Sequence, residues 1–256
     1  MSHMEKEKLL FYNEYEEFYE MAEKSIAFQN FCYDSFGQDF SQDGFSNIEQ
    51  IDMILPYIPT GEDVHILDIG CGNGKMLGYL QKKTGAFIHG FYYSQKAISN
   101  ARALFTQKAD FNEGIIGEIE YQDNSFDIVV SMDTMYFSRD MSAFVGQIKR
   151  WLKPDGILFV GYQEGDLVPR TFDENTTELA KALKNNGMNF ETRNITKQTY
   201  ELLKKKREAA VIHKAEFENE GRVQWFDMLM MQTKCAEGSY QQFERKMARY
   251  IYTARK

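Results

Sequence analysis

Segments in which apolar residues have the spacing of a strand alternate along the chain with segments in which they have the spacing of a helix. In the middle of the sequence, short runs rich in β-branched and aromatic residues are followed by longer segments with apolar residues at helical spacing. These patterns predict strands at 64–69, 86–92, about 111–116, 126–132 and 157–162, and helices at 74–84, 95–106 and 140–152. Such alternation is typical of a mostly parallel, doubly wound α/β sheet with helices on both faces.

Two flanking regions extend this core. Residues 5–36 have apolar and aromatic residues at helical spacing, which predicts one or two helices, and a polar break at 37–46 precedes a helix at 48–55. Beyond 172 the pattern predicts a helix at 173–186, a strand at 189–195, helices at about 197–218 and 222–237, and a last strand at 247–254. These two strands bring the predicted sheet to seven.

We expect one structural domain with three parts: an N-terminal helical cap segment (1–58), a core (59–172) and the C-terminal part of the sheet (173–256). The helices at about 197–237 lie between two predicted strands and therefore form an insertion. Trp225 and the methionines near it give this insertion an apolar, adaptable surface. The surface is expected either to cover the sheet or to form a lid over a substrate pocket together with the N-terminal helices.

The composition narrows the classes of partner. The net charge is −8, whereas a protein that binds nucleic acid usually has a basic face, so nucleic acid is not expected. The basic cluster at 204–207 is flanked by glutamates and predicts a solvated helix face. No run approaches the ~18 apolar residues of a membrane span. Three widely spaced cysteines predict reduced thiols, a cytoplasmic location and no metal site. A monomer or homodimer with a small-molecule substrate is expected.

The most informative segment is VHILDIGCGNG at 64–74. An apolar run leads into Asp68 and then into glycines at 70, 72 and 74, which predicts a buried strand, a tight turn and the start of a helix. Glycines let a ligand approach the main chain closely. The spacing differs from the dinucleotide fingerprint, and the Lys-Ser/Thr pair of a P-loop is lacking. The ligand is therefore not expected to be a polyphosphate.

Two further motifs follow in order, NSFDIVV at 124–130 and LKPDGIL at 152–158. Together with the glycine turn they resemble the class I S-adenosylmethionine-dependent methyltransferases of small-molecule type, which have a Rossmann-like fold. The resemblance implies S-adenosylmethionine as cofactor and S-adenosylhomocysteine as product. It implies these cofactor-binding positions: Asp68, Gly70, Cys71, Gly72, Asn73, Gly74, Tyr92, Tyr93, Ser94, Ile115, Ile116 and Met132.

Two positions depart from the family's pattern. Tyr92 stands where the family has an acidic residue that binds both ribose hydroxyls, and the loss of its charge is expected to cost ~1–3 kcal/mol of cofactor binding. Ile115 stands where the family often has an Asp that meets the adenine amino group. Three explanations are open: altered anchoring with ordinary chemistry, a different ligand, or a catalytically weak domain that serves as a binding or partner subunit.

Methyl transfer from a sulfonium needs little covalent help, because the donor is activated and the leaving group is neutral. A general base would help a hydroxyl or carbon acceptor, whereas aromatic faces would help an amine acceptor. The catalytic candidates are Asp133 and Tyr136, with Tyr162 and Glu164 as weaker ones. The substrate-contact candidates are Tyr33, Phe36, Tyr136 and Tyr162, beside a polar island at Gln38, Ser41, Gln42 and Asp43.

The leading hypothesis is a cytoplasmic methyltransferase that acts on a small molecule in a capped pocket. The alternative is a non-catalytic or altered-cofactor member of the same fold that binds a ligand or a partner.

Overall fold

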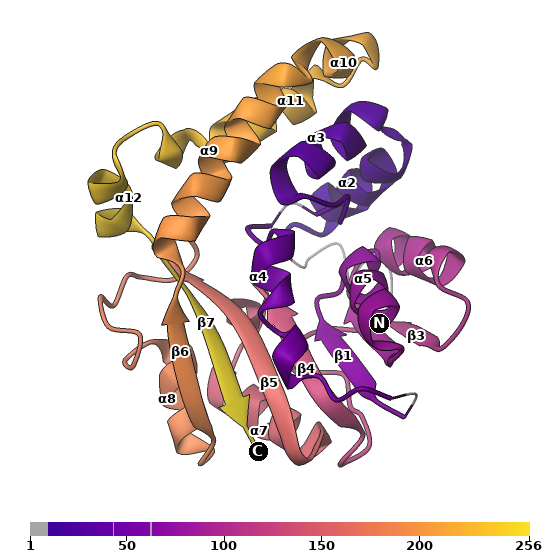
Figure 1. Ribbon diagram of the computed structural model, residues 1–256, viewed down its shortest axis with the longest axis vertical. Coiled ribbons are helices and arrows are strands. Elements are labelled where there is room, and N and C mark those ends of the chain that lie inside the picture. Colours follow the sequence, from indigo (N-terminus) through magenta and orange to yellow (C-terminus); the bar gives the residue numbers. More distant parts are fainter. Residues whose placement is uncertain (1–9, 43, 62) are drawn as a thin grey trace.

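The computed structural model describes residues 10–42, 44–61 and 63–256. Its centre is a seven-stranded sheet in the order β3-β2-β1-β4-β5-β7-β6 (Figure 1). β7 runs antiparallel to both neighbours, β5 and β6, and the other pairs are parallel. The strands are β1 (His65–Ile69), β2 (Phe87–Tyr92), β3 (Ala109–Glu113), β4 (Phe126–Met132), β5 (Leu152–Glu164), β6 (Asn189–Asn194) and β7 (Ala248–Arg255). The predicted seven-stranded, mostly parallel sheet is confirmed.

Helices cover both faces of this sheet (Figure 1). The covering helices are α5 (Lys75–Thr84) and α6 (Gln95–Leu104) on one face, and α7 (Met141–Trp151) and α8 (Glu178–Asn185) on the other. Alternate side chains of the inner strands enter the two cores. Ile128 and Val130 of β4 pack on the α5 and α6 side, and Val129 packs on the α7 and α8 side. Because both faces are buried, the central strands are apolar along their length.

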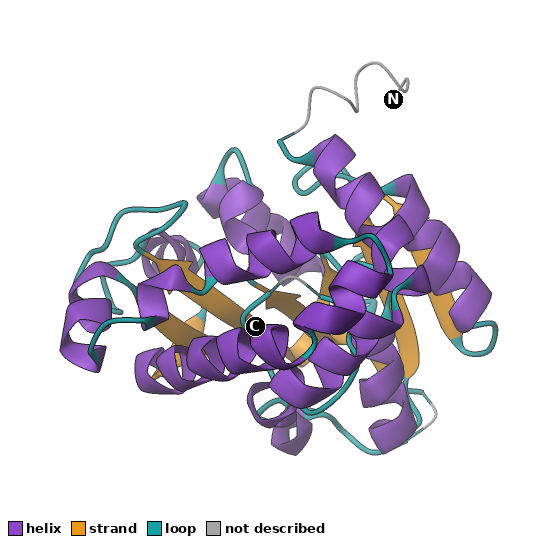
Figure 2. Ribbon diagram, turned by 90° about the horizontal axis from the view of Figure 1, so that it is seen from above, coloured by secondary structure: helices purple, strands orange, loops and turns teal. Residues whose placement is uncertain are grey.

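A helical cap lies over the carboxyl ends of the parallel strands (Figures 1 and 2). Its helices are α2 (Tyr12–Lys24), α3 (Ile26–Phe36), α9 (Thr196–Ile212), α10 (Lys214–Asn219) and α11 (Val223–Gln232). The contacts that join its N- and C-terminal parts include that of His213, 2.7 Å from Asp34, and that of the Ala27 N–H, which donates to Glu220 at 2.9 Å. The predicted insertion therefore packs on the N-terminal helices. Between them and β1 the chain forms α4 (Ile48–Asp52) and the short 3-10 helix η1 (Leu55–Tyr57).

Several element boundaries differ from the sequence prediction, and one helix was not predicted. α12 (Tyr240–Lys246) was not expected, although Ser239 and Gln242 form the capping box that announces it. β5 begins five residues early, at Leu152, because this residue already pairs with Phe126 ahead of an irregularity in the ladder. α8 begins only at Glu178, where Thr177 caps it. Two 3-10 turns, η2 (Met135–Phe137) and η3 (Lys234–Ala236), complete the described elements.

The basic cluster at 204–207 is not the fully solvated face that the sequence suggested. Lys206 has no exposed surface, and its ammonium group donates to the Gly44 carbonyl at 3.2 Å. The same group lies 5.4 Å from the ring centroids of both Phe36 and Phe45. The π faces and the carbonyl supply the partners that a buried cation requires.

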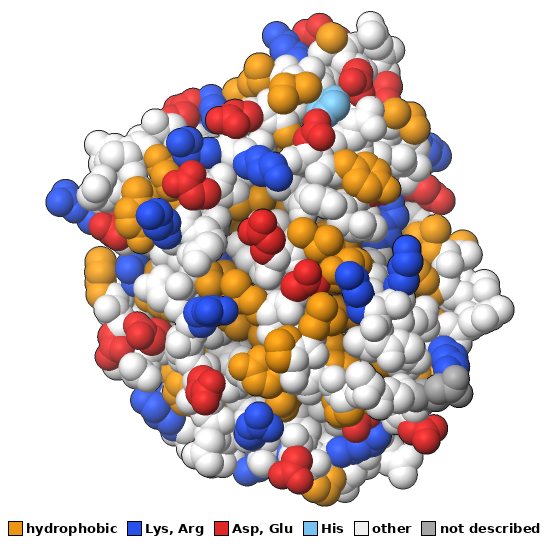
Figure 3. Space-filling model, in the orientation of Figure 1, with side chains coloured by type: hydrophobic (Ala, Val, Ile, Leu, Met, Phe, Trp, Pro, Cys, Tyr) orange, Lys and Arg blue, Asp and Glu red, His pale blue; other side chains and the backbone are white. Residues whose placement is uncertain are grey.

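Several broader features concern the whole molecule. No helix within 10–42, 44–61 or 63–256 is long and apolar enough to cross a bilayer. Within the same ranges, no group of three or more His, Cys, Asp or Glu side chains is placed to hold a metal ion. Cys32 and Cys71 are buried free thiols, and Cys235 is an exposed one. Figure 3 shows acidic and basic side chains interspersed on the face in view.

Candidate functional site

The glycine turn joins the carboxyl end of β1 to α5. Gly70, Gly72 and Gly74 have φ angles of 82°, 53° and 75°, in the left-handed region that side chains with a Cβ rarely adopt. The N–H groups of Gly70 and Cys71 both donate to the Phe91 carbonyl of β2, at 3.0 and 3.1 Å. The backbone conformation therefore requires glycine, and two hydrogen bonds fix the turn against the end of β2.

Side chains from distant elements lie directly on these glycines. A methyl group at Gly72 would lie 2.2 Å from the Tyr19 hydroxyl of α2, and one at Gly70 would lie 2.5 Å from the Thr134 methyl carbon. Thr134 is itself fixed, because its hydroxyl donates to the Ile69 carbonyl at 2.6 Å. The missing side chains thus open the main chain to close approach, and Tyr19 makes such an approach in this structure.

Asp68 lies beneath the turn and is 3% exposed. No hydrogen bond or ion pair reaches its carboxylate from the described residues. Burial raises its pKa from 3.8 to about 8. Burial, and then the charge of Asp68, also raise the pKa of the Cys71 thiol well above its ordinary value. A buried carboxylate without a partner would gain from a cationic group placed beside it.

Tyr92 belongs to a cluster of tyrosines at the end of β2. Tyr15 and Tyr19 of α2 lie edge-on to it, with ring centroids 5.9 and 5.8 Å away, and Tyr93 lies at 4.7 Å. Burial, followed by the neighbouring phenols, raises the pKa of Tyr92 well above its ordinary value. Tyr92 therefore places a neutral phenol, surrounded by other tyrosine rings, where the family has a carboxylate.

The catalytic candidate Asp133 is held in a buried ion pair. Arg249 of β7, 1% exposed, donates to both carboxylate oxygens, at 2.9 Å from Nε and 2.6 Å from Nη2. The same guanidinium donates to Ser46 Oγ and to the Phe45 carbonyl, each at 2.8 Å, and to the Gln50 amide oxygen. Because both oxygens of Asp133 accept from Arg249, the geometry argues against a general base and for a tie between the cap and the sheet.

Tyr136 and Tyr162 lie in different surroundings. Burial, and then the charge of Asp133, raise the pKa of Tyr136 well above its ordinary value, so this phenol keeps its proton near neutral pH. Tyr162 is 1% exposed and packs in the core on the α7 and α8 side. Its ring centroid lies 6.0 Å from that of Tyr136 and 6.2 Å from that of Tyr252. Tyr162 is therefore a core residue in this structure, and its contact with a substrate stays a prediction.

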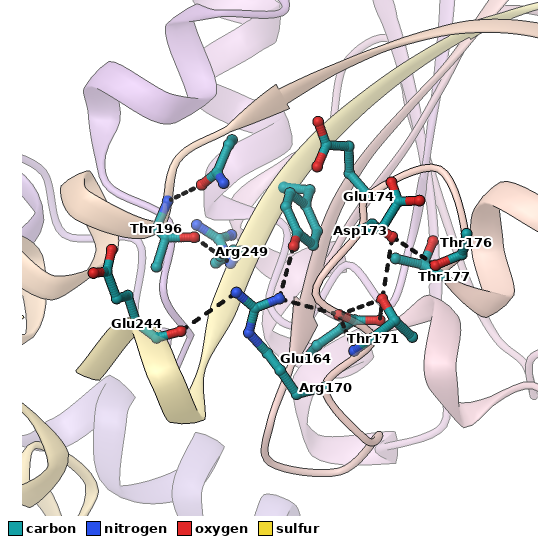
Figure 4. A network of polar contacts seen from close by, with 12 residues as sticks. Glu164, Arg170, Thr171, Asp173, Glu174, Thr176, Thr177, Thr196, Glu244 and Arg249 are labelled. Atoms are coloured by element: carbon teal, nitrogen blue, oxygen red, sulfur yellow. Dashed lines mark hydrogen bonds and ion pairs between the residues drawn. The ribbon is translucent and has the colours of Figure 1, made fainter. Parts of the chain in front are cut away.

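Glu164, the weaker base candidate, organises the loop after β5 (Figure 4). The Thr171 backbone N–H donates to its carboxylate at 3.0 Å, and the Arg170 guanidinium lies 3.7 Å from it. Arg170 also donates to the Tyr250 hydroxyl at 3.0 Å. The Glu164 carboxylate is therefore bound by residues of the loop that follows β5.

Three other predicted positions have structural roles. Tyr33 lies on the outside of α3 and is 54% exposed, and Phe36 is 1% exposed beneath Lys206. Ser94 caps α6, because its hydroxyl accepts the Ala97 N–H at 3.0 Å. In this structure these residues lie on the surface, in the core and at a helix cap, and their contact with a cofactor or substrate stays a prediction.

The remaining predicted cofactor positions stay close to the turn. Asn73 is 4% exposed, and its side-chain oxygen accepts the Lys75 N–H at 3.4 Å. The backbone N–H of Gly114 donates to the Tyr92 carbonyl at 3.0 Å, which places the half-buried pair 115–116 beside the end of β2. Met132 ends β4 and packs against Gly161 of β5. Their contact with a cofactor stays a prediction.

Part of the predicted polar island is fastened to the turn. The ammonium group of Lys75, at the start of α5, pairs with Asp39 and donates to Ser41 Oγ at 2.6 Å. The Ser41 N–H in turn donates to Asp39 at 2.8 Å. Asp43 of the same island lies outside the described residues. The cap segment is therefore held beside the glycine turn by charge and hydrogen bonds.

Sequence reasoning missed Tyr15, Tyr19 and Arg249 as site residues. The two tyrosines were recognised only as part of an amphipathic stripe, and nothing in their spacing shows which surface the stripe covers. Arg249 carried a clearer signal: it is a charged residue inside the apolar run of the last strand, where only a buried partner makes it stable.

Comparison with known proteins shows what this chain is similar to. Residues 67–160 match the family model described as a methyltransferase domain. Phosphoethanolamine N-methyltransferase of Plasmodium falciparum is 30% identical over 129 residues, 49% of this chain and 48% of that protein. Ubiquinone biosynthesis O-methyltransferase of Neisseria meningitidis is 30% identical over 113 residues, 41% of this chain and 48% of that protein. The chain spans about half the length of these curated relatives.

Among solved structures, phosphoethanolamine N-methyltransferase 2 of Haemonchus contortus superposes with a TM-score of 0.72 at 20% identity. The match covers 94% of this chain and 59% of that one, which was solved with phosphomonomethylethanolamine and S-adenosylhomocysteine. Residues 67–160 match a methyltransferase domain, which bears out the resemblance to class I S-adenosylmethionine-dependent methyltransferases predicted from the glycine turn and its two companion motifs.

Proposed function

We propose that this protein transfers the methyl group of S-adenosylmethionine to a small-molecule acceptor. The proposal rests mainly on the glycine turn. Its three glycines have left-handed backbone conformations, and beside them lies the buried carboxyl group of Asp68, which has no partner among the described residues. Gly70 and Gly72 would lie against the amino-acid part of the cofactor, and Asp68 would pair with its cationic amino group. When bound, the cofactor supplies an activated methyl group with a neutral leaving group. Tyr92 would meet the ribose as an uncharged partner.

The side chains near the end of β4 favour an amine as the methyl acceptor. Asp133 is bound on both oxygens by Arg249, and Tyr136 keeps its proton, so neither offers a ready proton acceptor. A neutral amine attacks through its lone pair before it loses a proton, whereas a neutral hydroxyl needs a base. The tyrosine rings of the cluster suit the positive charge that an amine gains in this step. The rate would come mainly from alignment in a site without water.

One observation favours the second candidate, a ligand-binding or partner subunit of the same fold. The Tyr19 hydroxyl lies on Gly72, the glycine that a cofactor would have to approach most closely. For the enzyme, α2 or the Tyr19 side chain must yield when the cofactor enters. For a non-catalytic subunit, the tyrosine cluster would stay closed over the turn.

Calorimetry with S-adenosylmethionine and S-adenosylhomocysteine separates the two candidates. Micromolar binding supports the enzyme, and no heat of binding at millimolar ligand rejects it in favour of the closed subunit.

Gly72→Ala should abolish binding, because its methyl group would fill the approach to the main chain. Gly85→Ala is the matched control, since Gly85 has a φ of 77° but no neighbour within 4 Å of its Cβ position. Both substitutions place a Cβ on a backbone with positive φ, so a difference between them reports on the turn.

A further inference from the structure

A hollow of about 680 Å³ lies between η3 and α12, on segments outside the glycine turn and the tyrosine cluster. Sites for small molecules typically enclose roughly 300–1,000 Å³, so the size suits a metabolite. Its wall includes Phe243, which is 2% exposed and gives the hollow an apolar side. Figure 3, in the orientation of Figure 1, shows Lys and Arg side chains beside apolar ones over this region at the left.

Three cations line this hollow: Lys234 of η3, and Arg245 and Lys246 of α12. Throughout the described part of the chain, no side chain forms a salt bridge or hydrogen bond with any of the three charged groups. The one carboxylate in the lining, that of Glu237, is already paired with Arg207. In a chain with a net charge of −8, three cations without an ion-pair partner around one hollow attract anions.

We propose that this hollow binds a small molecule that carries a phosphate group. Arg245 offers the planar fork that fits phosphate oxygens in pairs, and the two lysines add point charges around it. The apolar side formed by Phe243 suits a short carbon skeleton attached to the phosphate. The site is separate from the methyl-transfer site proposed above, and it holds whether or not that proposal does.

Cys235 makes the site measurable, because it is an exposed free thiol in the same lining, whereas Cys32 and Cys71 are buried. Burial, and then the charge of Asp166, raise its pKa, so the reaction is followed at about pH 8.5, where more thiolate is present. The readout is the rate at which Cys235 reacts with the dianionic reagent dithiobis-nitrobenzoate and with the neutral reagent dithiodipyridine. Cys235→Ser identifies the signal, since it should remove the fast phase.

Inorganic phosphate at constant ionic strength should slow both reactions saturably. The triple variant Lys234→Gln, Arg245→Gln, Lys246→Gln should weaken this protection by roughly tenfold or more. The control is a second triple variant, which removes the same charge from exposed positions elsewhere and should leave protection unchanged: Lys82→Gln, Lys197→Gln, Lys205→Gln. Equal protection in the two triple variants, or none in the parent protein, would overturn the proposal.

A second arm separates a soluble ligand from a lipid headgroup, which carries the same phosphate chemistry. Vesicles of phosphatidic acid and phosphatidylcholine are compared with glycerol 3-phosphate in the same assay. Protection by glycerol 3-phosphate supports a small-molecule site. Protection by the vesicles alone would show a surface that meets membranes and would overturn the small-molecule assignment.

Discussion

At the scale of single residues, Tyr92 and Asp68 carry the unusual electrostatics of this domain. The family's ribose-binding carboxylate is replaced by a buried phenol, while the carboxylate under the glycine turn has no partner among the described residues. A carboxylate is therefore lacking where the sugar would bind, and burial raises the pKa of the carboxyl group where an amino group would bind to about 8. Both features are local consequences of residue type, and each can be tested by one substitution.

Tyr92→Asp is expected to weaken S-adenosylhomocysteine binding by at least about tenfold, because a carboxylate would be buried among the rings of Tyr15, Tyr19 and Tyr93. Tyr92→Phe keeps the ring and should change the affinity by less than about tenfold, the value of one neutral hydrogen bond. Titration calorimetry measures both. Tighter binding by the Asp variant would show that Tyr92 is a lost anchor and not a recruited one.

The raised pKa of Asp68 predicts a stability that depends on pH. Between 3.8 and about 8 the folded protein keeps a proton that the unfolded chain releases, so stability falls as pH rises through this range. From pH 6 to 8 the free energy of unfolding of the parent should drop by about 2 kcal/mol relative to Asp68→Asn, measured by urea denaturation. Asp227→Asn, at an exposed position, is the control. Parallel stability curves for the parent and Asp68→Asn would contradict the prediction.

At the scale of elements, Arg249 joins three parts of the chain that are distant in sequence. It extends from β7 to the end of β4 through Asp133, and to the cap through Ser46 and Gln50. Asp133 has a φ of 62°, a left-handed conformation that few residues adopt, and the ion pair fixes it there. The same short segment places Thr134 on the glycine turn. The pair therefore positions the turn as well as the cap.

Arg249→Met should lower the free energy of unfolding by about 3–5 kcal/mol, because it leaves a buried carboxylate without its partner. Chemical denaturation measures this loss. Adding Asp133→Asn to the variant should recover part of it, since asparagine removes the charge and tolerates the left-handed backbone. If the single variant loses less than about 1 kcal/mol, the pair is solvated and the buried interpretation is wrong.

At the scale of the whole molecule, the cap is held together by a histidine between two carboxylates. His213 joins α9 to Asp34 of α3 at 2.7 Å and to Glu216 of α10 at 3.0 Å. Burial alone would lower its pKa, but the bonds to Glu216 and Asp34 raise it above 6.5. A histidine whose pKa is raised by its two carboxylate partners therefore ties parts of the cap to one another.

His213→Gln is expected to destabilise the protein most in mildly acidic solution. A raised folded pKa means that the stabilising charge is fully present below pH 6.5 and is lost as pH rises through the folded value. The difference in unfolding free energy between parent and variant should therefore shrink from pH 6 to 9. His89→Gln is the contrasting control, because burial lowers the pKa of His89 to about 4 and reverses the pH dependence. A constant difference for His213→Gln would exclude the charged contact.

The sequence by itself determined the sheet, most of the element order and the glycine turn, because these depend on periods and glycine positions within about ten residues. Only the tertiary structure decided which side chains meet at the turn. Tyr19 and Arg249 reach the site from opposite ends of the chain, and neither contact follows from a local pattern. Likewise, Asp133 became an ion-pair partner and Lys206 a buried cation, because burial and pairing depend on neighbours that only packing supplies.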